Sequence, residues 1–187
     1  MLTMERIKNL TKQARQMNDE ELKEAFIKSF GEEKWAEEEM LGKLITFSMD
    51  VAEVLGIDYL PIMFEEMAED SRIYFEEEYI AINEKYKDNF VECAKCVTHE
   101  LRHVYQLFYV KLFNDAKAKR MKKELANSKE LDPNDLTAVT DYSFRETEID
   151  AFAFTKWYLK NHLDMDVTHP SKDYELLVSS YMDKYFN

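Results

Sequence analysis

Residues 97–103, Val-Thr-His-Glu-Leu-Arg-His, carry the pattern His-Glu-x-x-His within a stretch of helical periodicity. Residues four apart on a helix lie one turn above each other, so His99 and His103 can present imidazole nitrogens to one metal ion. Zinc is the metal that suits two neutral imidazoles. Glu100 is rotated by about 100° from His99, which keeps its carboxylate off the metal and close to a metal-bound water. The pattern therefore predicts a zinc site with Glu100 as general base.

The helix that carries this pattern has two apolar sectors separated by a polar strip. One sector is the stripe expected of any helix that packs on a core, and the other contains both histidines. A helix buried on two sides favours a metal site over a solvated pair, although two ordinary histidines remain the alternative interpretation. The stripe consists of Ala94, Val97, Leu101, Val104 and Phe108, the second sector of Cys96, His99, His103, Leu107 and Val110, and the polar strip of Thr98, Arg102 and Gln106.

A catalytic zinc ion usually has three protein ligands and one open position, so a third ligand is expected elsewhere in the chain. The segment 145–153, Arg-Glu-Thr-Glu-Ile-Asp-Ala-Phe-Ala, offers candidates on the next helix. Glu146 and Asp150 share a face, whereas Glu148 projects about 200° away from Glu146, so only one glutamate can face the site. Glu146 is preferred because Asp150 comes with it and could orient a ligand imidazole. The alternative is a charged helix face that packs through Phe152, Phe154 and Trp157.

The order His99-Glu100-x-x-His103 and then Glu146-x-x-x-Asp150 resembles the gluzincin arrangement of zinc peptidases. Over about residues 60–160 the chain is similar to small bacterial metallopeptidases of the ImmA/IrrE type, although Arg102 and Ile149 stand where many relatives carry Gly and Ala. The resemblance implies His99, His103 and Glu146 as zinc ligands, Glu100 as catalytic base and Asp150 as a supporting residue. It also implies a zincin-like fold whose edge strand, here assigned to residues 79–83, holds an extended peptide substrate.

The hydrophobic periodicity along the rest of the chain predicts an α+β protein that is predominantly helical, with a small, mostly antiparallel sheet before the His-Glu-x-x-His helix. One domain over residues 1–187 is expected, with an N-terminal helical region at 1–56 and a zincin-like core at 57–187. Gly31 and Gly56 suit helix ends, and residues 127–140 suit a loop. The expected helices are 3–17, 19–30, 32–55, 89–125, 143–162 and 171–185, and the expected strands are 60–64, 72–75 and 79–83.

Charge and composition exclude several classes of protein. The chain has 25 Lys and Arg against 38 Asp and Glu, a net charge of -13, so nucleic acid is not an expected partner. The basic run Lys117–Lys123 is interpreted as a solvated helix face. No membrane contact is expected, because no apolar run approaches the roughly 20 residues that span a bilayer. The absence of a signal-peptide pattern predicts a cytoplasmic location.

Two cysteines do not form a disulfide framework, which agrees with a reducing compartment. Cys93 and Cys96 are expected to be buried packing residues, and a structural zinc site of Cys93, Cys96 and His99 is the alternative. An oxyanion stabiliser is also needed for peptide hydrolysis. The candidates Tyr142, His162 and His169 are side chains that can donate hydrogen bonds near the second motif, and each is more readily explained as structural.

Three functions are compatible with these patterns. The preferred one is zinc-dependent hydrolysis of a peptide or protein substrate, because a binding protein does not need a base beside its metal. The second is a regulatory or binding protein of zincin-like shape with a structural metal. The third is a helical interaction protein whose acidic segment 19–39 contacts a basic partner.

Overall fold

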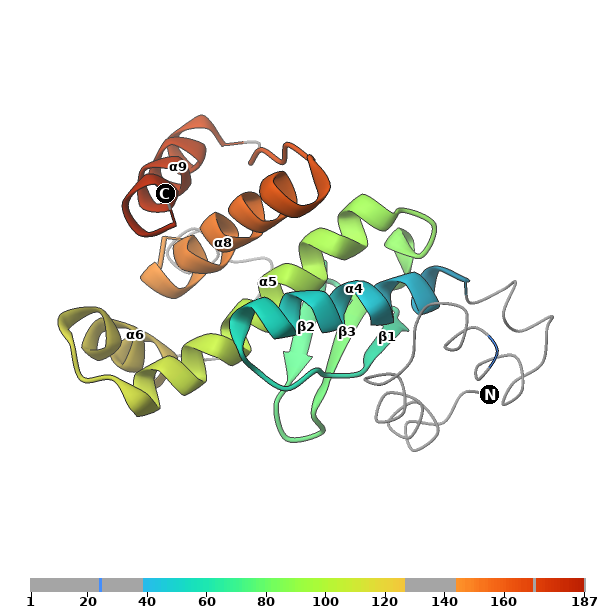
Figure 1. The fold of residues 1–187 in the computed structure, drawn as a ribbon, viewed down its shortest axis with the longest axis horizontal. Helices are drawn as coiled ribbons and strands as arrows, with labels where there is room; N and C mark the ends of the chain where they lie inside the picture. Colours follow the sequence, from blue (N-terminus) through green and yellow to red (C-terminus); the bar gives the residue numbers. More distant parts are fainter. Residues whose placement is uncertain (1–23, 25–38, 127–143, 170, 187) are drawn as a thin grey trace. The chain divides into compact units, whose positions relative to one another are not determined.

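The computed structural model describes residues 24, 39–126, 144–169 and 171–186, and the chain divides into two compact units, Met1–Val97 and Thr98–Asn187. The helices expected at 3–17 and 19–30, the helix end at Gly31 and the loop at 127–140 lie outside the described residues. The described part is predominantly helical with a small sheet, so it has the expected α+β character. Figure 1 labels its helices and strands. No described helix combines the length and the apolar character that spanning a membrane requires.

The first unit contains the helix α4, Glu39–Leu55, and a three-stranded sheet. The helix ends where the sequence indicates, at Gly56, whose φ of 64° lies in the left-handed region that glycine adopts without a steric cost. The N–H of Gly56 donates to Glu53 O at 3.0 Å, and the N–H of Ile57 donates to Ala52 O at 3.0 Å. These bonds satisfy carbonyls that the end of a helix would otherwise leave open.

The sheet has the strand order β1-β3-β2 and is mixed, not mostly antiparallel. β3 pairs in parallel with β1 and antiparallel with β2, so residues 79–83 form the central strand and the prediction of an edge strand there is wrong. The run Ile80-Ala81-Ile82 is fully buried, as expected for a strand covered on both faces. All three strands lie within one residue or two of their predicted places: β1 is Ile62–Glu65, β2 is Ser71–Tyr74 and β3 is Tyr79–Asn83.

The expected single helix over 89–125 is two helices, α5 at Phe90–Leu112 and α6 at Ala116–Ala126. The break has a local cause, because Asp115 Oδ1 accepts the N–H of Ala118 at 2.7 Å and so starts a new helix. The Tyr109 hydroxyl donates to the other oxygen of Asp115 at 2.6 Å. An aspartate three residues before a helical N–H is a start signal that periodicity alone overlooks.

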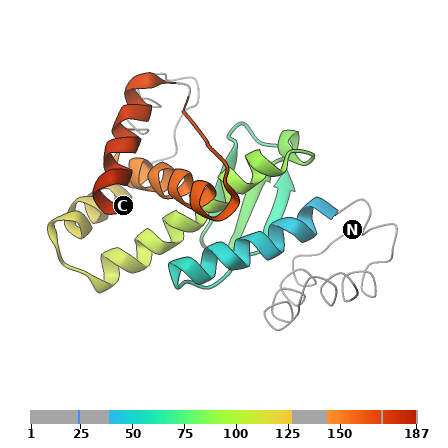
Figure 2. The same cartoon turned by 45° about the horizontal axis from the view of Figure 1, so that its top comes forward.

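The second unit is built from the later part of α5, from α6, and from the two helices α8, Glu146–Leu163, and α9, Lys172–Tyr185. Figure 2 shows α9 packed beside α8. Ile149 and Ala153 of α8 pack against Tyr174 and Val178 of α9 in a buried apolar cluster. Both helices begin close to their predicted starts, and Ser171 accepts the N–H of Tyr174 at 3.4 Å at the start of α9. Packing against α9 contributes to the rotation of α8 about its own axis.

Candidate metal centre

The two histidines of α5 and a glutamate of α8 converge in the second unit. The Nε2 atoms of His99 and His103 lie 3.0 Å apart. The Glu148 carboxylate lies 3.2 Å from Nε2 of His99 and 3.4 Å from Nε2 of His103. Among the described residues these three side chains form the one group of His, Cys, Asp or Glu whose ligand atoms could share a metal ion. His99, His103 and Glu148 therefore define the candidate metal centre.

The spacing of these atoms fits a zinc ion. Tetrahedral zinc with ligand bonds of about 2.0–2.1 Å places its ligand atoms about 3.3 Å from one another. The separation of the two Nε2 atoms, 3.0 Å, lies close to that value, and each oxygen of Glu148 lies at a similar distance from one histidine, Oε2 at 3.2 Å from His99 and Oε1 at 3.4 Å from His103. Two imidazoles and one carboxylate are also a common donor set for catalytic zinc. The residues present would thus supply three ligands and leave a fourth position without a protein ligand.

The hydrogen bonds of Gln106 determine which nitrogen of His103 carries the proton. The amide nitrogen of Gln106 donates to Thr147 O at 2.8 Å and to Asp150 Oδ2 at 2.9 Å. Its Oε1, 2.9 Å from Nδ1 of His103, must then accept a hydrogen bond from that nitrogen. Nε2 of a neutral His103 consequently has a lone pair directed toward His99 and Glu148. This is the tautomer that metal coordination requires.

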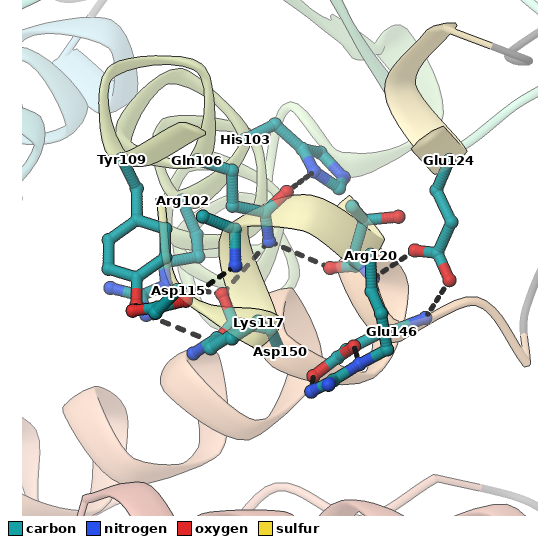
Figure 3. Close-up of polar contacts among 12 residues, drawn as sticks. Arg102, His103, Gln106, Tyr109, Asp115, Lys117, Arg120, Glu124, Glu146 and Asp150 are labelled. Atoms are coloured by element: carbon teal, nitrogen blue, oxygen red, sulfur yellow. Dashed lines mark hydrogen bonds and ion pairs between the residues drawn. The ribbon is translucent and has the colours of Figure 1, made fainter. Parts of the chain in front are cut away.

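Asp150 is fully buried, and it accepts a hydrogen bond from Gln106 instead of contacting an imidazole. Its carboxylate binds Arg102 through Nε at 2.7 Å and Nη2 at 3.1 Å, and Lys117 through Nζ at 2.9 Å. Burial alone would raise the pKa of Asp150, but the charges of Arg102 and Lys117 lower it to about 2. The expectation that Asp150 directly orients a ligand imidazole is therefore wrong. It acts on His103 through Gln106, as Figure 3 shows.

Glu146 does not face the histidines, and the prediction that it does is wrong. Its carboxylate forms a two-point ion pair with Arg120 of α6, with Nε at 2.5 Å and Nη2 at 2.8 Å. Glu148, about 200° further round the helix, takes the place expected of Glu146. The sequence had reduced the choice to these two glutamates, and the rotation of α8 decides between them.

The sequence did not indicate that Arg102 and Gln106 belong to the site. Both were placed on a polar strip, together with Thr98, yet Thr98, Arg102 and Gln106 are all buried. Phe108, placed on the core stripe, is instead exposed. Arg102 binds Asp150 of α8, but no spacing rule connects residues 48 positions apart in the sequence.

The charges at the site couple His103 to Glu148. Burial lowers the pKa of His103, but the charge and hydrogen bond of Glu148 and the charge of Glu100 raise it to about 9. Burial raises the pKa of Glu148, and the two histidines outweigh that effect and hold it well below its usual range. In the metal-free protein a proton on His103 therefore neutralises Glu148. A metal ion would replace that proton.

Glu100 and His99 complete the centre. Glu100 is buried, and its negative charge raises the pKa of His103. The ring of His99 packs edge-on against Phe152 at 4.6 Å between centroids. Its Nδ1 is buried and has no hydrogen-bond partner among the described residues, so His99 is held by ring packing.

The other candidates that the sequence suggested either do not belong to the candidate metal group or lie outside the described residues. The thiols of Cys93 and Cys96 face backbone carbonyls, Tyr86 O at 3.1 Å and Asp70 O at 3.7 Å, and neither joins the candidate metal group. Tyr142 lies outside the described residues. His162 is exposed and stacks on Tyr158 at 4.3 Å, and His169 Nδ1 accepts the N–H of Ser171 at 3.1 Å. These contacts do not identify His162 or His169 as an oxyanion stabiliser.

Comparison with known proteins adds no family to this description. No family model, no curated protein and no solved structure matches the chain.

Proposed function

We propose that this chain is a zinc-dependent peptidase with His99, His103 and Glu148 as metal ligands and Glu100 as general base. The observation that carries the proposal is the convergence of the two Nε2 atoms and the Glu148 carboxylate within 3.0–3.4 Å of one another. A base beside such a group has no purpose in a purely structural metal site, which supports hydrolysis over metal storage or stabilisation. Peptides are the proposed substrates through the gluzincin resemblance, with Glu148 in place of Glu146.

A bound zinc ion would supply a Lewis acid and lower the pKa of a bound water to about 7. The Glu100 carboxylate accepts a proton from the attacking water as the new C–O bond to the peptide carbonyl forms. The protonated Glu100 then gives that proton to the nitrogen of the leaving amine as the C–N bond breaks. Gln106 holds His103 in the tautomer that the site needs.

The experiment compares Glu100→Gln with the wild type after removal of metal and addition of one equivalent of zinc. A proteome-derived peptide mixture, read by mass spectrometry, samples many sequences at once. We expect zinc-dependent cleavage by the wild type, and a loss of about 100-fold or more in Glu100→Gln with unchanged zinc content. Glu92→Gln, on the same helix and paired with Lys95, is the matched control and should remain active. Equal activity of the two variants contradicts the role of Glu100.

The second candidate function is a binding protein with a structural metal. It is favoured by the low exposure of the ligands, whose side chains are 14% (His99), 12% (His103) and 7% (Glu148) accessible. A substrate needs access to the metal, whereas a structural ion does not. Full zinc occupancy with no cleavage of any peptide, and loss of folding after metal removal, would support this function instead.

A further inference from the structure

The helix that carries Glu148 lacks a cap of its own. The N-cap residue of α8 is Arg145, which is extended (φ -67°, ψ 147°) and whose side chain makes no capping hydrogen bond. The first N–H groups of a helix have no partner within the helix and need one from elsewhere. Glu124 of α6 provides it: Oε1 accepts the N–H of Glu146 at 3.1 Å and Oε2 accepts the N–H of Thr147 at 3.0 Å. Figure 3 shows this contact beside the Arg120–Glu146 ion pair.

Thr147, the residue immediately before Glu148, is thereby held through both its backbone N–H and its carbonyl. Glu124 accepts the N–H of Thr147, and Gln106 donates to the carbonyl of Thr147 at 2.8 Å. Glu148 follows as the third residue of α8, within the first turn, where helices fray most readily. A ligand in a fraying turn would sample several directions. The two bonds to Thr147 restrict the backbone from which the Glu148 side chain extends.

The rest of α6 is attached to the same part of α8. Lys117, Arg120 and Glu124 follow the spacing that places side chains on one helix face. They contact Asp150, Glu146 and the N–H groups of the first turn, respectively. A carboxylate at a helix N-terminus also interacts favourably with the helix dipole. Of these contacts, only that of Glu124 reaches the backbone of the turn that carries Glu148.

We propose that Glu124 is a positioning residue of the metal centre: its carboxylate fixes the first turn of α8 and thereby directs Glu148 toward His99 and His103. The inference rests on the proposed metal site and names a residue outside it, 24 positions away from Glu148 in the chain. Glu124 does not touch the metal or the substrate. Its removal leaves all three ligands in place and loosens only the geometry of one.

The test is a titration of the metal-free full-length protein with Co²⁺, which substitutes for zinc and reports its coordination by visible absorption. We expect Glu124→Ala to bind Co²⁺ about tenfold or more weakly, with a changed absorption spectrum, as for other losses of a supporting residue. Adding Arg145→Asp to Glu124→Ala should restore binding to within about threefold, because an aspartate at the N-cap accepts the N–H groups of the same turn.

The matched control is Asp166→Ala, which removes an exposed carboxylate of the same unit that pairs with Lys160. It should leave the Co²⁺ affinity and spectrum unchanged. If Glu124→Ala does not fold, Glu124→Gln, which keeps one acceptor oxygen, is expected to show an intermediate affinity. Wild-type Co²⁺ binding in Glu124→Ala, or no rescue by Arg145→Asp in a folded protein, overturns the inference. Failure of the wild type itself to bind Co²⁺ overturns the proposed function instead.

Discussion

Arg102 of α5 and Asp150 of α8 form a two-point ion pair that is almost closed to solvent. The separations are 2.7 Å from Nε to Oδ2 and 3.1 Å from Nη2 to Oδ1, and the side chains are 8% and 0% exposed. The guanidinium also lies over the rings of Tyr105 and Phe154, at 4.3 and 5.0 Å from its central carbon. The pair fixes the carboxylate that holds Gln106, and Gln106 in turn holds His103.

Replacing Arg102 by Met should therefore destabilise the protein strongly. It leaves the buried charge of Asp150 with Lys117 as its one remaining cation, and breaking a buried pair costs about 3 kcal/mol. Urea unfolding followed by circular dichroism measures the change in the free energy of unfolding. Arg120→Met is the control, because its ion pair with Glu146 is more open to solvent and should contribute much less. Equal losses of unfolding free energy in the two variants would show that the buried ion pair contributes no more to stability than the exposed one.

The choice between the two glutamates can be tested directly. Glu148→Ala should weaken zinc binding by more than about 100-fold, because it removes a ligand and not merely a supporting contact. Glu146→Ala should bind zinc like the wild type, since its carboxylate is occupied by Arg120. Competition with a chromophoric chelator measures both affinities. Loss of zinc in Glu146→Ala with retention in Glu148→Ala would contradict the assignment.

Gln106→Leu should weaken zinc binding by about 10- to 100-fold while the three ligands stay in place, as for other second contacts of metal-bound histidines. The leucine cannot accept a hydrogen bond from Nδ1 of His103. It also leaves Thr147 O and Asp150 without the hydrogen bonds that the Gln106 amide nitrogen donates to them. Thr155→Val serves as control, because the Thr155 hydroxyl is also buried but bonds to Ala151 O within its own helix. Equal zinc affinities in the two variants would contradict a role of Gln106 in supporting His103.

The stability of the metal-free protein should depend on pH through His103 and Glu148. The raised pKa of His103 means that its contribution is complete below pH 6.5 and is lost as pH rises through about 9. The lowered pKa of Glu148 means that its contribution is present above pH 4.5 and is lost as pH falls toward its folded-state value. The pair thus stabilises the fold most between pH 4.5 and 6.5.

Thermal unfolding in the presence of a chelator measures this dependence. The melting temperature of the wild type should decrease from pH 6.5 to 9, and Glu148→Gln should show a much smaller decrease, because only the charge of Glu100 then still raises the pKa of His103. Zinc affinity should follow the opposite trend and rise with pH over the same range, since the ion displaces the proton on His103. A pH-independent zinc affinity would contradict this coupling.

A single backbone position in the first unit offers a stabilising change. Glu78, in the turn between β2 and β3, has a φ of 59°, a conformation that costs a non-glycine residue about 1 kcal/mol. Glu78→Gly should raise the free energy of unfolding by about that amount, reduced somewhat by the added freedom of the unfolded chain. Glu77→Gly, one residue earlier and at a negative φ, should instead lower it. Denaturant unfolding of both variants decides the sign.

The sequence by itself was enough to predict features that depend on local spacing. His99, Glu100 and His103 lie on one helix at known angles, and the three short apolar runs become the three strands. Gly56 ends α4 because its conformation is a property of that residue alone. Helix periods and turn residues act over a few positions, so one chain segment contains all the information that they require.

Only the tertiary structure decided which residues of distant segments meet. α8 is buried on nearly every side from Thr147 to Thr155, so no apolar stripe marks the direction in which it turns. Its packing on α9 and its attachments to α6 set that rotation, which turns Glu148 toward the histidines and gives Glu146 to Arg120. The central place of β3 likewise depends on pairing with two separate strands. Periodicity defines which side chains share a face, but the neighbour that the face meets is determined by packing across the whole unit.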